Sequence, residues 1–381
     1  MKKLIFSYLL MLANVCMMNA QEYVCNTEQI HVAVIMPFDL DNNAKSIESK
    51  KALDFYKGIL LTVDSMKHAG VNIDVLALDE GYGDNSKITS VIQHPFLKEA
   101  DVIIGPGRNA NISPLTTFAQ LNHVPLVVPF TNTPGIPEGK PYVFQCNTKH
   151  AAHYTKVFNR FVKMHSNETI LFVNMNDSHS GPFTAEFTNH LAENAIPYHH
   201  VDFSEFDDHL FELLDSTRNN ILVPSSPTAK AFDMLCLKLD DMKILDKYQV
   251  QLIGTPEWQT LPAKSQKSMY RYRATFFTGY YNNNLSSRTK AFISKFNDAF
   301  HHEQYGSYPR YGEMGHDISA FFLTAIQRYG NQLFKNIQLH DYNSLQLPLH
   351  FVRDNENSGF TNQATYIIYY KPEGDVILST F

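Results

Sequence analysis

The sequence ADVIIGPGRNANISPLTTFAQLNHVPLVVPFTNTPGIP, residues 100–137, determines the fold of the chain. Residues 101–105 form a short apolar run that ends at Gly-Pro, and residues 126–130 form a second run that ends in a polar loop. Between them, Ser113 and Pro114 predict the start of a helix over residues 115–122, with the Ser113 hydroxyl as the N-cap. This order of strand, helix and strand predicts one βαβ unit of a parallel sheet.

The two polar loops of this unit are candidate binding segments, because open α/β sheets bind ligands at the carboxyl ends of their strands. The candidate residues are Arg108, Asn109 and Asn111 in the first loop and Thr131, Asn132 and Thr133 in the second. Arg108 suits bidentate pairing with an anion, but a solvated surface arginine remains an equal alternative. Residues 131–133 also favour an ordinary turn before a proline, and this alternative stays open.

The segment GPGRNA, residues 105–110, matches the GxGxxA pattern of dinucleotide-binding loops. That pattern requires a helix that starts inside the motif, so that its amides meet the pyrophosphate. Here Pro106 removes one amide, and the helix signal waits until Ser113. We therefore expect a loop that binds a small carboxylate, and no nucleotide or other cofactor.

Strand and helix patterns alternate along the rest of the chain. Residues 30–37 are a nearly continuous apolar run, typical of a strand buried on both faces, and residues 52–67 repeat apolar side chains at helical spacing. A second alternation starts at residues 169–174, and residues 274–280 form a strand that leads back to the first half. This pattern predicts two similar α/β lobes with parallel sheets.

The first twenty residues are typical of an export signal rather than of folded structure. Lys2 and Lys3 precede an apolar run, and Ala20 offers a small residue for cleavage. The run is shorter than the ~20 residues that span a bilayer, so we expect no retained anchor. The residues before Cys16 form a poor lipobox, so we expect free export to the periplasm rather than a lipoprotein, peripheral to the membrane at most.

Charge and cysteine content exclude several classes of function. The net charge is −6 and no basic stripe is visible, which argues against nucleic-acid binding. The cysteines that follow the signal are Cys25, Cys146 and Cys236, and their spacing matches no zinc pattern. An odd number leaves at least one thiol free, and we favour buried, unpaired thiols over a disulfide. No metal site is expected.

Several segments carry a resemblance to a known family: IHVAVIMPF at residues 30–38, ADVIIGP at 100–106, VPLVVPF at 124–130, NDSHSG at 176–181 and GHDISAFFLTAI at 315–326. The chain resembles the type I periplasmic binding proteins, the leucine/isoleucine/valine-binding group of ABC-transporter solute receptors. It is closest to the Bacteroidetes members often fused to LysM modules. The resemblance implies two doubly wound parallel-sheet lobes, joined by three crossovers, that close over a ligand. We place the first lobe at residues 28–147 plus 281–335, and the second at 148–280 plus 336–381, after a signal peptide at 1–20.

The resemblance also implies binding residues in the second lobe. Loops after its strands supply Ser180 and the pair Glu257 and Trp258. A carboxylate there can hold a ligand ammonium and an indole can stack on it, whereas a surface acid and a Trp that covers the lobe edge are the open alternatives. Asn109 and Asn111 stand where the family has small residues, so the identity of the ligand is left open.

We expect a non-catalytic receptor for a small polar ligand, an amino acid or a related metabolite, that works with an ABC permease. The alternative is a cell-envelope protein that binds peptidoglycan or a cell-wall enzyme on the same fold, without transport. An exported hydrolase is the weakest hypothesis. Asp177, Ser178 and His179 are adjacent in sequence and cannot form a catalytic triad, which requires residues that the fold brings together.

Overall fold

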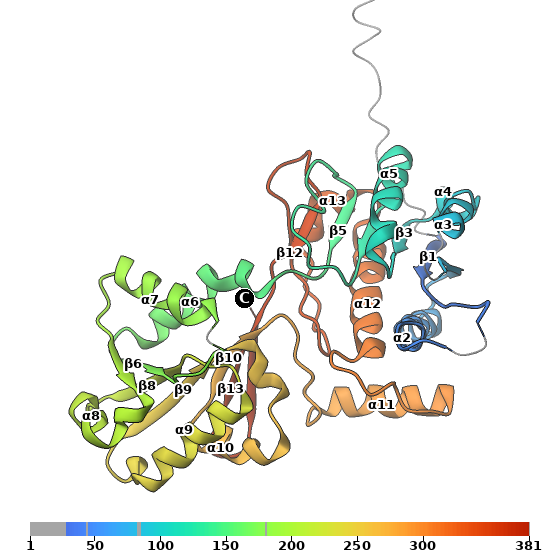
Figure 1. Ribbon diagram of the computed structural model, residues 1–381. Helices are drawn as coiled ribbons and strands as arrows, with labels where there is room; N and C mark the ends of the chain where they lie inside the picture. Colours follow the sequence, from blue (N-terminus) through green and yellow to red (C-terminus); the bar gives the residue numbers. More distant parts are fainter. Residues whose placement is uncertain (1–27, 43–44, 82–84, 180, 381) are drawn as a thin grey trace, which may run out of the picture.

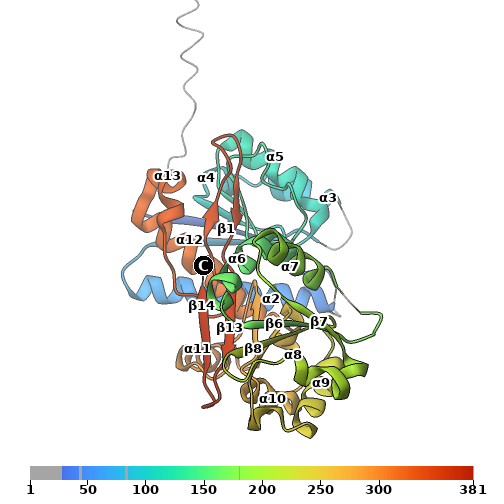
Figure 2. The same cartoon turned by 90° about the vertical axis from the view of Figure 1, so that its left-hand side faces the viewer.

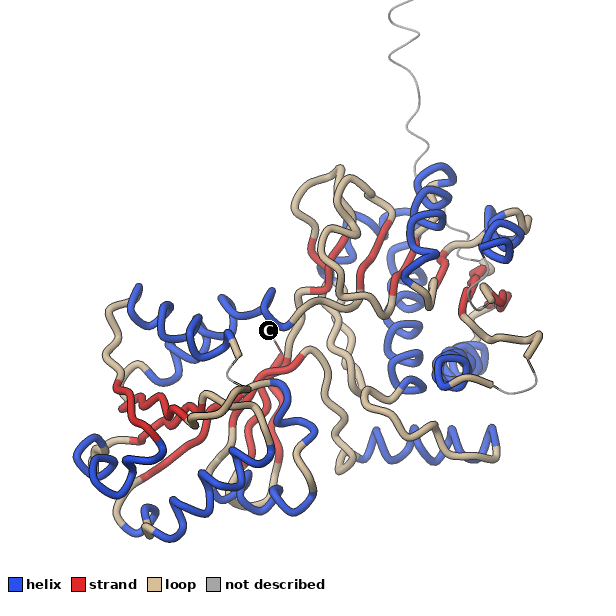
Figure 3. Tube along the Cα trace, in the orientation of Figure 1, coloured by secondary structure: helices blue, strands red, loops and turns tan. Residues whose placement is uncertain are grey.

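The computed structural model describes residues 28–42, 45–81, 85–179 and 181–380. The molecule has two lobes, each built on a seven-stranded sheet with helices around it (Figures 1 and 3). The predicted α/β architecture of two doubly wound lobes is confirmed, although each sheet also carries antiparallel strands at one edge. The predicted signal peptide, Cys16 and Cys25 lie outside the described residues. Within the described residues, no helix combines the length and apolar character needed to cross a membrane.

The first sheet has the strand order β11-β12-β5-β4-β3-β1-β2. Its strands are β1 Ile30–Met36, β2 Ile73–Asp79, β3 Val102–Ile104, β4 Leu126–Val128, β5 Val143–Gln145, β11 Phe351–Val352 and β12 Phe360–Asn362. Its helices are α2 Ile47–His68, α3 Asn85–Ile92, α4 Phe96–Glu99, α5 Ile112–Asn122, α11 Ser287–Phe300, α12 Tyr311–Tyr329 and α13 Leu333–Asn336. β1 lies inside the sheet because its apolar side chains are buried on both faces, as the sequence predicts.

The two long helices of the first lobe, α2 and α12, pack against each other. α2 begins after Ser46, whose side-chain oxygen accepts a hydrogen bond from the N–H of Ser49 (3.1 Å). A Cβ atom at Gly58 would overlap the carbonyl oxygen of Gly312, and one at Gly315 would overlap the carbonyl oxygen of Phe55. These glycines therefore allow the two backbones to approach closely, which fixes where α12 begins relative to α2.

The second sheet has the order β14-β13-β10-β9-β8-β6-β7. Its strands are β6 Thr169–Asn174, β7 His199–Asp202, β8 Asn219–Pro224, β9 Gln249–Gly254, β10 Thr275–Thr278, β13 Tyr366–Tyr370 and β14 Val376–Thr380. Its helices are α6 Tyr154–His165, α7 Pro182–Glu193, α8 Phe206–Leu213, α9 Ala229–Asp241 and α10 Gln266–Arg271. β13 and β14 form an antiparallel hairpin at its edge, next to β10 (Figure 2).

Short 3₁₀ helices occupy several of the loops: η1 Asn109–Asn111, η2 His150–His153, η3 Phe203–Glu205, η4 Ile244–Asp246, η5 Pro256–Thr260, η6 Ala263–Ser265, η7 Gly330–Gln332 and η8 Ile337–Leu339. η1 leads directly into α5, which begins at Ile112 with Asn111 as its N-cap residue. The prediction that Ser113 caps this helix is therefore wrong. Pro114 still lies in the first turn, where its missing N–H leaves no hydrogen bond unmade.

The chain passes between the lobes three times, at residues 146–149, 279–286 and 363–365, as predicted. Side chains tie these crossovers together. The Asn362 amide donates to the carbonyl oxygens of Cys146 (3.1 Å) and Pro348 (2.9 Å). The Thr365 hydroxyl donates to the carbonyl oxygen of Thr278 (2.9 Å). The connection between the lobes is thus a hydrogen-bonded unit rather than three independent strands of chain.

The predicted boundary of the second lobe is wrong for part of the C-terminal segment, which was assigned to it from residue 336 to residue 381. β12 pairs in parallel with β5, and β11 pairs with β12, so residues 351–362 complete the first sheet. Only β13 and β14 join the second sheet. The chain therefore stays in the first lobe from its second crossover to its third.

Candidate functional site

Each sheet contains one point at which its strand order reverses direction. In the first sheet this point lies between β1 and β3, and in the second between β6 and β8. Helical connections leave in opposite directions there, which opens a crevice at the carboxyl ends of the two strands, where open α/β sheets bind ligands. A cavity lies at each of these points, and the two cavities form the candidate site.

The first-lobe cavity has a volume of about 440 Å³. Five segments line it: the loop after β1, the start of α2, the loop after β3, the loop after β4 and the start of α12. Lys51 and Arg108 supply positive charge, and the rings of Phe130 and Tyr311, 5.4 Å apart, supply an apolar wall. The predicted residue Asn109 also lines this cavity.

The second-lobe cavity has a volume of about 500 Å³ and lies between the loop after β6 and the start of α9. Asp177, His179 and Lys230 line it, and the Asp177 carboxylate accepts a hydrogen bond from the N–H of His179 (3.0 Å). α9 is capped by Thr228, whose hydroxyl oxygen accepts from the N–H of Ala231 (3.2 Å). The predicted residue Ser180 lies outside the described residues.

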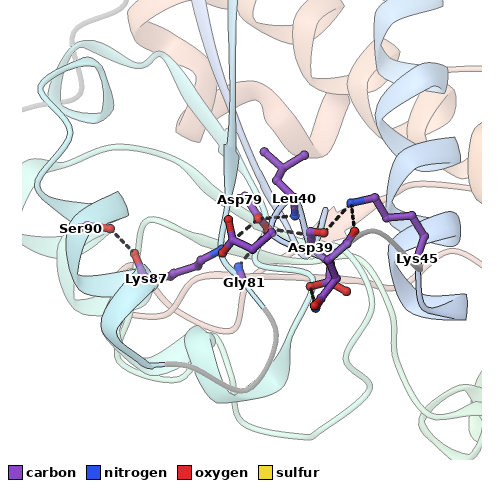
Figure 4. Close-up of polar contacts among 9 residues, drawn as sticks. Asp39, Leu40, Lys45, Asp79, Gly81, Lys87 and Ser90 are labelled. Atoms are coloured by element: carbon purple, nitrogen blue, oxygen red, sulfur yellow. Dashed lines mark hydrogen bonds and ion pairs between the residues drawn. The ribbon is translucent and has the colours of Figure 1, made fainter.

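Asp79, the last residue of β2, fixes the loop that follows β1 (Figure 4). Its carboxylate accepts hydrogen bonds from the N–H groups of Asp39 (3.1 Å), Leu40 (2.9 Å) and Gly81 (3.0 Å), and from the Lys87 ammonium (3.3 Å). Burial acts to raise the pKa of Asp79, but these donors outweigh burial and hold the pKa below its ordinary value. The carboxylate therefore holds the rim of the first-lobe cavity in place.

Glu80, the next residue, fixes the loop that follows β3. It is buried, and its carboxyl group accepts from the N–H groups of Gly107 (2.7 Å) and Arg108 (3.2 Å) and from the side-chain amide of Asn111 (2.6 Å). Burial raises the pKa of Glu80 to about 7, against the opposing effect of these three donors and of the Arg108 charge. The amides expected to bind a ligand carboxylate therefore bind a side chain of the protein itself.

This arrangement also bears on the hypothesis that residues 105–110 form a dinucleotide-binding loop. α5 begins at Ile112, after the motif rather than within it, and the amides of Gly107 and Arg108 donate to Glu80. The α-helix start that the fingerprint requires within the motif is therefore missing, and two of the motif's N–H groups are already bonded. The geometry argues against the dinucleotide fingerprint, and the expectation that this loop holds no nucleotide stays a prediction.

The remaining predicted residues of the first lobe lie in three different environments. Asn111 is buried and its amide is bonded to Glu80, so it supports the loop from inside. The Thr131 hydroxyl is buried and bonds to the hydroxyl (3.1 Å) and N–H (3.3 Å) of Thr133, which is the turn alternative. Asn132 and Thr133 are exposed at the carboxyl edge of the sheet. The prediction that these two contact a ligand stays a prediction.

Trp258 does not face a ligand. It is 1% exposed, and its indole packs against Phe232 in the core of the second lobe (ring centroids 4.9 Å apart). Gly254, one turn earlier, provides the space, since a Cβ there would overlap the indole. The prediction of Trp258 as a stacking platform is therefore wrong, and its alternative, a Trp that covers the lobe, is closer to the structure.

Glu257 is exposed in η5, close to the side of the second lobe that meets the first. Burial lowers the pKa of His150, and the Glu257 carboxylate opposes this effect. The same carboxylate adds to burial in raising the pKa of Tyr280, on the second crossover. Next to it, the Gln259 side-chain oxygen accepts from Tyr308 of the first lobe (3.2 Å), so this segment contacts both lobes.

Lys51, Tyr311 and Gln259 were missed by the sequence analysis. Lys51 lies near the start of the helix that follows β1, which is the position where a parallel sheet directs a helix toward its switch point. That signal was present in the sequence and was not used. Tyr311 reaches the site only because α12 packs on α2, which no local pattern reveals.

Three observations bear on catalytic and metal chemistry in the described part of the chain. The loop with Asp177 and His179 is largely exposed, and no group of three His, Cys, Asp or Glu side chains in the described ranges is arranged to hold a metal ion. Cys146 and Cys236 are free and buried, which confirms the prediction of unpaired thiols for these two residues. Burial raises the pKa of both thiols, so neither is a reactive thiolate.

Comparison with known proteins places the fold. No protein-family model matches the chain, and no curated protein sequence does. Among solved structures, a putative branched-chain amino acid ABC transporter protein from Rhodospirillum rubrum matches with a TM-score of 0.59 and 14% identity, over 92% of this chain and 100% of the other. A branched-chain amino acid ABC transporter periplasmic ligand-binding protein from Burkholderia xenovorans matches with a TM-score of 0.51 and 11% identity, over 93% and 95%. An ABC transporter substrate-binding protein from Desulfitobacterium hafniense matches with a TM-score of 0.50 and 13% identity, over 92% and 100%.

These matches define the class of fold: two α/β lobes of the type I periplasmic binding protein architecture. The sequence identities are low, so the matches establish how the chain folds and not what it binds. The resemblance drawn from the sequence motifs is thereby confirmed at the level of the fold.

Proposed function

We propose that this protein is a periplasmic, non-catalytic solute-binding protein that closes its lobes over a small polar ligand, an amino acid or a related metabolite, for an ABC transporter. The observation that carries this proposal is the pair of cavities at the switch points of two sheets whose lobes are joined by three crossovers. Rotation about the crossovers would close such a site over a ligand. The predicted contacts Arg108 and Asn109 on the first lobe, and Glu257 beside the crossovers, belong to this proposal.

A thermal-shift screen against amino acids, organic acids, sugars and short peptides tests the proposal. We expect at least one solute to raise Tm, and the same solute to reduce the radius of gyration in X-ray scattering as the lobes close. Ala110→Trp, which fills the first-lobe cavity from an exposed position, should abolish both effects. The matched variant Ala192→Trp, exposed at the end of α7, should not. A panel without any binder at millimolar concentration would contradict the proposal.

A second candidate is an envelope role, as in the LysM-joined Bacteroidetes members of the resemblance. One observation favours it: Glu80 accepts from the N–H groups of Gly107 and Arg108, and Thr131 bonds to Thr133, so these contacts hold both first-lobe loops without a ligand. This candidate predicts that a pull-down from envelope extracts recovers cell-wall enzymes or peptidoglycan fragments. Recovery of a permease instead would decide for transport.

A further inference from the structure

A third cavity lies at the crossovers, separate from the candidate site. Its volume is about 780 Å³, larger than the cavity at either switch point, and it shares no lining residue with them. Residues within 283–289, at the second crossover and the start of α11, form one part of its wall, and residues within 338–350, before β11, form another. Tyr366, Leu378 and Thr380 of the β13–β14 hairpin complete it. Both lobes therefore contribute to this cavity.

Arg288 supplies positive charge to the third cavity. One N–H group of its guanidinium donates to the carbonyl oxygen of Asn343 (2.7 Å), which also belongs to the lining, so the guanidinium is held at the wall. Burial raises the pKa values of Tyr342 and Tyr366, and the Asp317 carboxylate adds to this, whereas the Arg288 charge opposes it. The charge of Arg288 therefore acts on a tyrosine from each lobe.

The Tyr366 hydroxyl is an unused hydrogen-bond donor in the same wall. Its side chain is 6% exposed, and among the described residues its hydroxyl has no hydrogen-bond partner. Because burial raises its pKa, this hydroxyl keeps its proton at neutral pH and can donate. The Ser344 hydroxyl, buried in the same lining, also has no partner. Buried polar groups are normally hydrogen-bonded, so these two hydroxyls point to a polar occupant.

The N-terminal end of α11 faces the same cavity. The N-cap residue Ser286 and the first-turn residues Arg288 and Thr289 line it. The Ser286 side chain makes no capping hydrogen bond, and the first turn contains no acidic residue. The N–H groups at the start of a helix, together with the helix dipole, favour a bound anion. Together with Arg288 and the Tyr366 hydroxyl, this helix start gives the cavity three kinds of anion-binding group.

The other ionisable groups of the lining supply no further positive charge. Burial lowers the pKa values of His340 and His350, so both imidazoles are neutral at pH 7. Asp341 is exposed and lines the cavity, and the buried Asp317 carboxylate, whose charge reaches the two tyrosines, accepts three backbone N–H groups. Arg288 is therefore the single cation of the described lining at neutral pH, and a bound anion depends on it.

We propose that this cavity is a second ligand site, which binds a small molecule through an oxyanion group, a phosphate or a carboxylate, between Arg288 of the first lobe and the Tyr366 hydroxyl of the second. A volume of about 780 Å³ is in the range of small-molecule sites, and the side-chain amides of Asn283 and Asn343 lie in the lining to bind a polar body. Because the ligand contacts both lobes, its binding favours the arrangement of the lobes that brings these groups together. The inference does not depend on which ligand the candidate site takes.

Titration calorimetry with glucose 6-phosphate, gluconate, inorganic phosphate and glucose tests the inference, in a buffer without phosphate or carboxylate. We expect at least one of the three anions to bind, and glucose to bind at least tenfold more weakly, because glucose lacks the charge that Arg288 recognises. A preference for glucose 6-phosphate or for gluconate identifies the oxyanion, and binding of inorganic phosphate alone identifies the free ion as the ligand. No binding by any of the three at millimolar concentration, or equal affinity for glucose, would overturn the inference.

Substitution of Arg288 separates this site from general electrostatic attraction. Arg288→Gln should weaken the bound anion at least tenfold, and Arg288→Lys should retain part of the affinity. Lys290→Gln is the matched control, because Lys290 is exposed on the same helix, outside the cavity, and its loss removes the same charge. Equal losses of affinity in Arg288→Gln and Lys290→Gln would contradict a specific site.

Tyr366→Phe tests the contribution of the second lobe. It should weaken the bound anion at least fivefold without lowering Tm, since the hydroxyl has no partner among the described residues. Tyr369→Phe, on the same strand and outside the cavity, should change neither. Unchanged affinity in Tyr366→Phe would overturn the bridging role. If Ala110→Trp abolishes the anion binding, the anion occupies the first-lobe cavity, so this inference falls while the receptor function stands.

Discussion

Replacement of Glu80 by Gln tests whether a buried carboxyl group holds the binding loop after β3. Glu80 is 1% exposed and accepts three hydrogen bonds, from Gly107, Arg108 and Asn111. Gln has nearly the same shape but carries no charge and does not titrate. The variant removes the ionisation and replaces one accepting oxygen by an NH₂ group, so the hydrogen bonds change as well. That second effect does not depend on pH, so the pH dependence of the difference isolates the electrostatic part of the interaction.

The expected size of the effect follows from the pKa. Burial raises the pKa of Glu80 from 4.5 to about 7, so the folded protein holds this proton more tightly than the unfolded chain does. The stability that this group contributes is therefore present below pH 4.5 and is lost as the pH rises to 7. Between pH 5 and pH 8 the linkage relation gives a loss of about 2–3 kcal/mol, which Glu80→Gln does not share.

Chemical denaturation at pH 5 and pH 8 measures this difference. The unfolding free energy of Glu80→Gln minus that of the wild type should shift by about 2–3 kcal/mol in favour of the variant at the higher pH. All other titrating groups cancel in this comparison. Circular dichroism is the appropriate signal, because Trp258, the single Trp, reports on the other lobe. Glu99→Gln, exposed on α4, controls for the loss of one charge. If the difference in unfolding free energy between Glu80→Gln and the wild type is the same at both pH values, the reasoning is refuted.

Two further predictions concern the crossovers and the second core. The Asn362 side chain bonds to four backbone groups, including the carbonyl oxygen of Cys146 in the first crossover. Asn362→Ala should therefore lower the unfolding free energy, measured by urea denaturation, by about 3 kcal/mol or more. Asn355→Ala in the neighbouring exposed turn should lower it by less than about 0.5 kcal/mol. Trp258→Ala should lower the unfolding free energy of the second lobe by about 3–5 kcal/mol, measured by circular dichroism, and leave ligand affinity at low temperature unchanged. An affinity loss of tenfold or more would show that Trp258 contributes to ligand binding.

The order of elements and the two-lobed architecture could be predicted because local patterns carry them. A continuous apolar run such as residues 30–36 is a buried strand wherever it lies, and the alternation with helices permits few topologies. The C-terminal segment could not be assigned in the same way. β11 and β12 have two and three residues, and their lobe is decided by the pairing of Phe360 with Phe144, far apart in the chain.

The candidate site was predicted less well than the fold, and for one physical reason. Two side chains that local rules assign to a ligand, Asn111 and Trp258, instead contact residues distant in sequence, Glu80 and Phe232. Asn111 was expected to face the ligand, but Glu80, 31 residues earlier, accepts its amide hydrogen. Trp258 was expected in an exposed loop, but a 3₁₀ turn brings it over Gly254. A glycine four residues before a lone Trp at a strand end is a usable signal for such a fold-back.

The adjacent acids at the end of β2 hold two loops of the first lobe, those after β1 and β3. Successive residues of an extended strand point in opposite directions, so Asp79 reaches the loop after β1 while Glu80 reaches the loop after β3. Both loops are then held whether or not a ligand is present. The N–H groups of Gly107 and Arg108 are already bonded to Glu80, so a ligand in this cavity would meet other groups of its lining. Lys51, placed by α2 against the Tyr311 ring, is such a group.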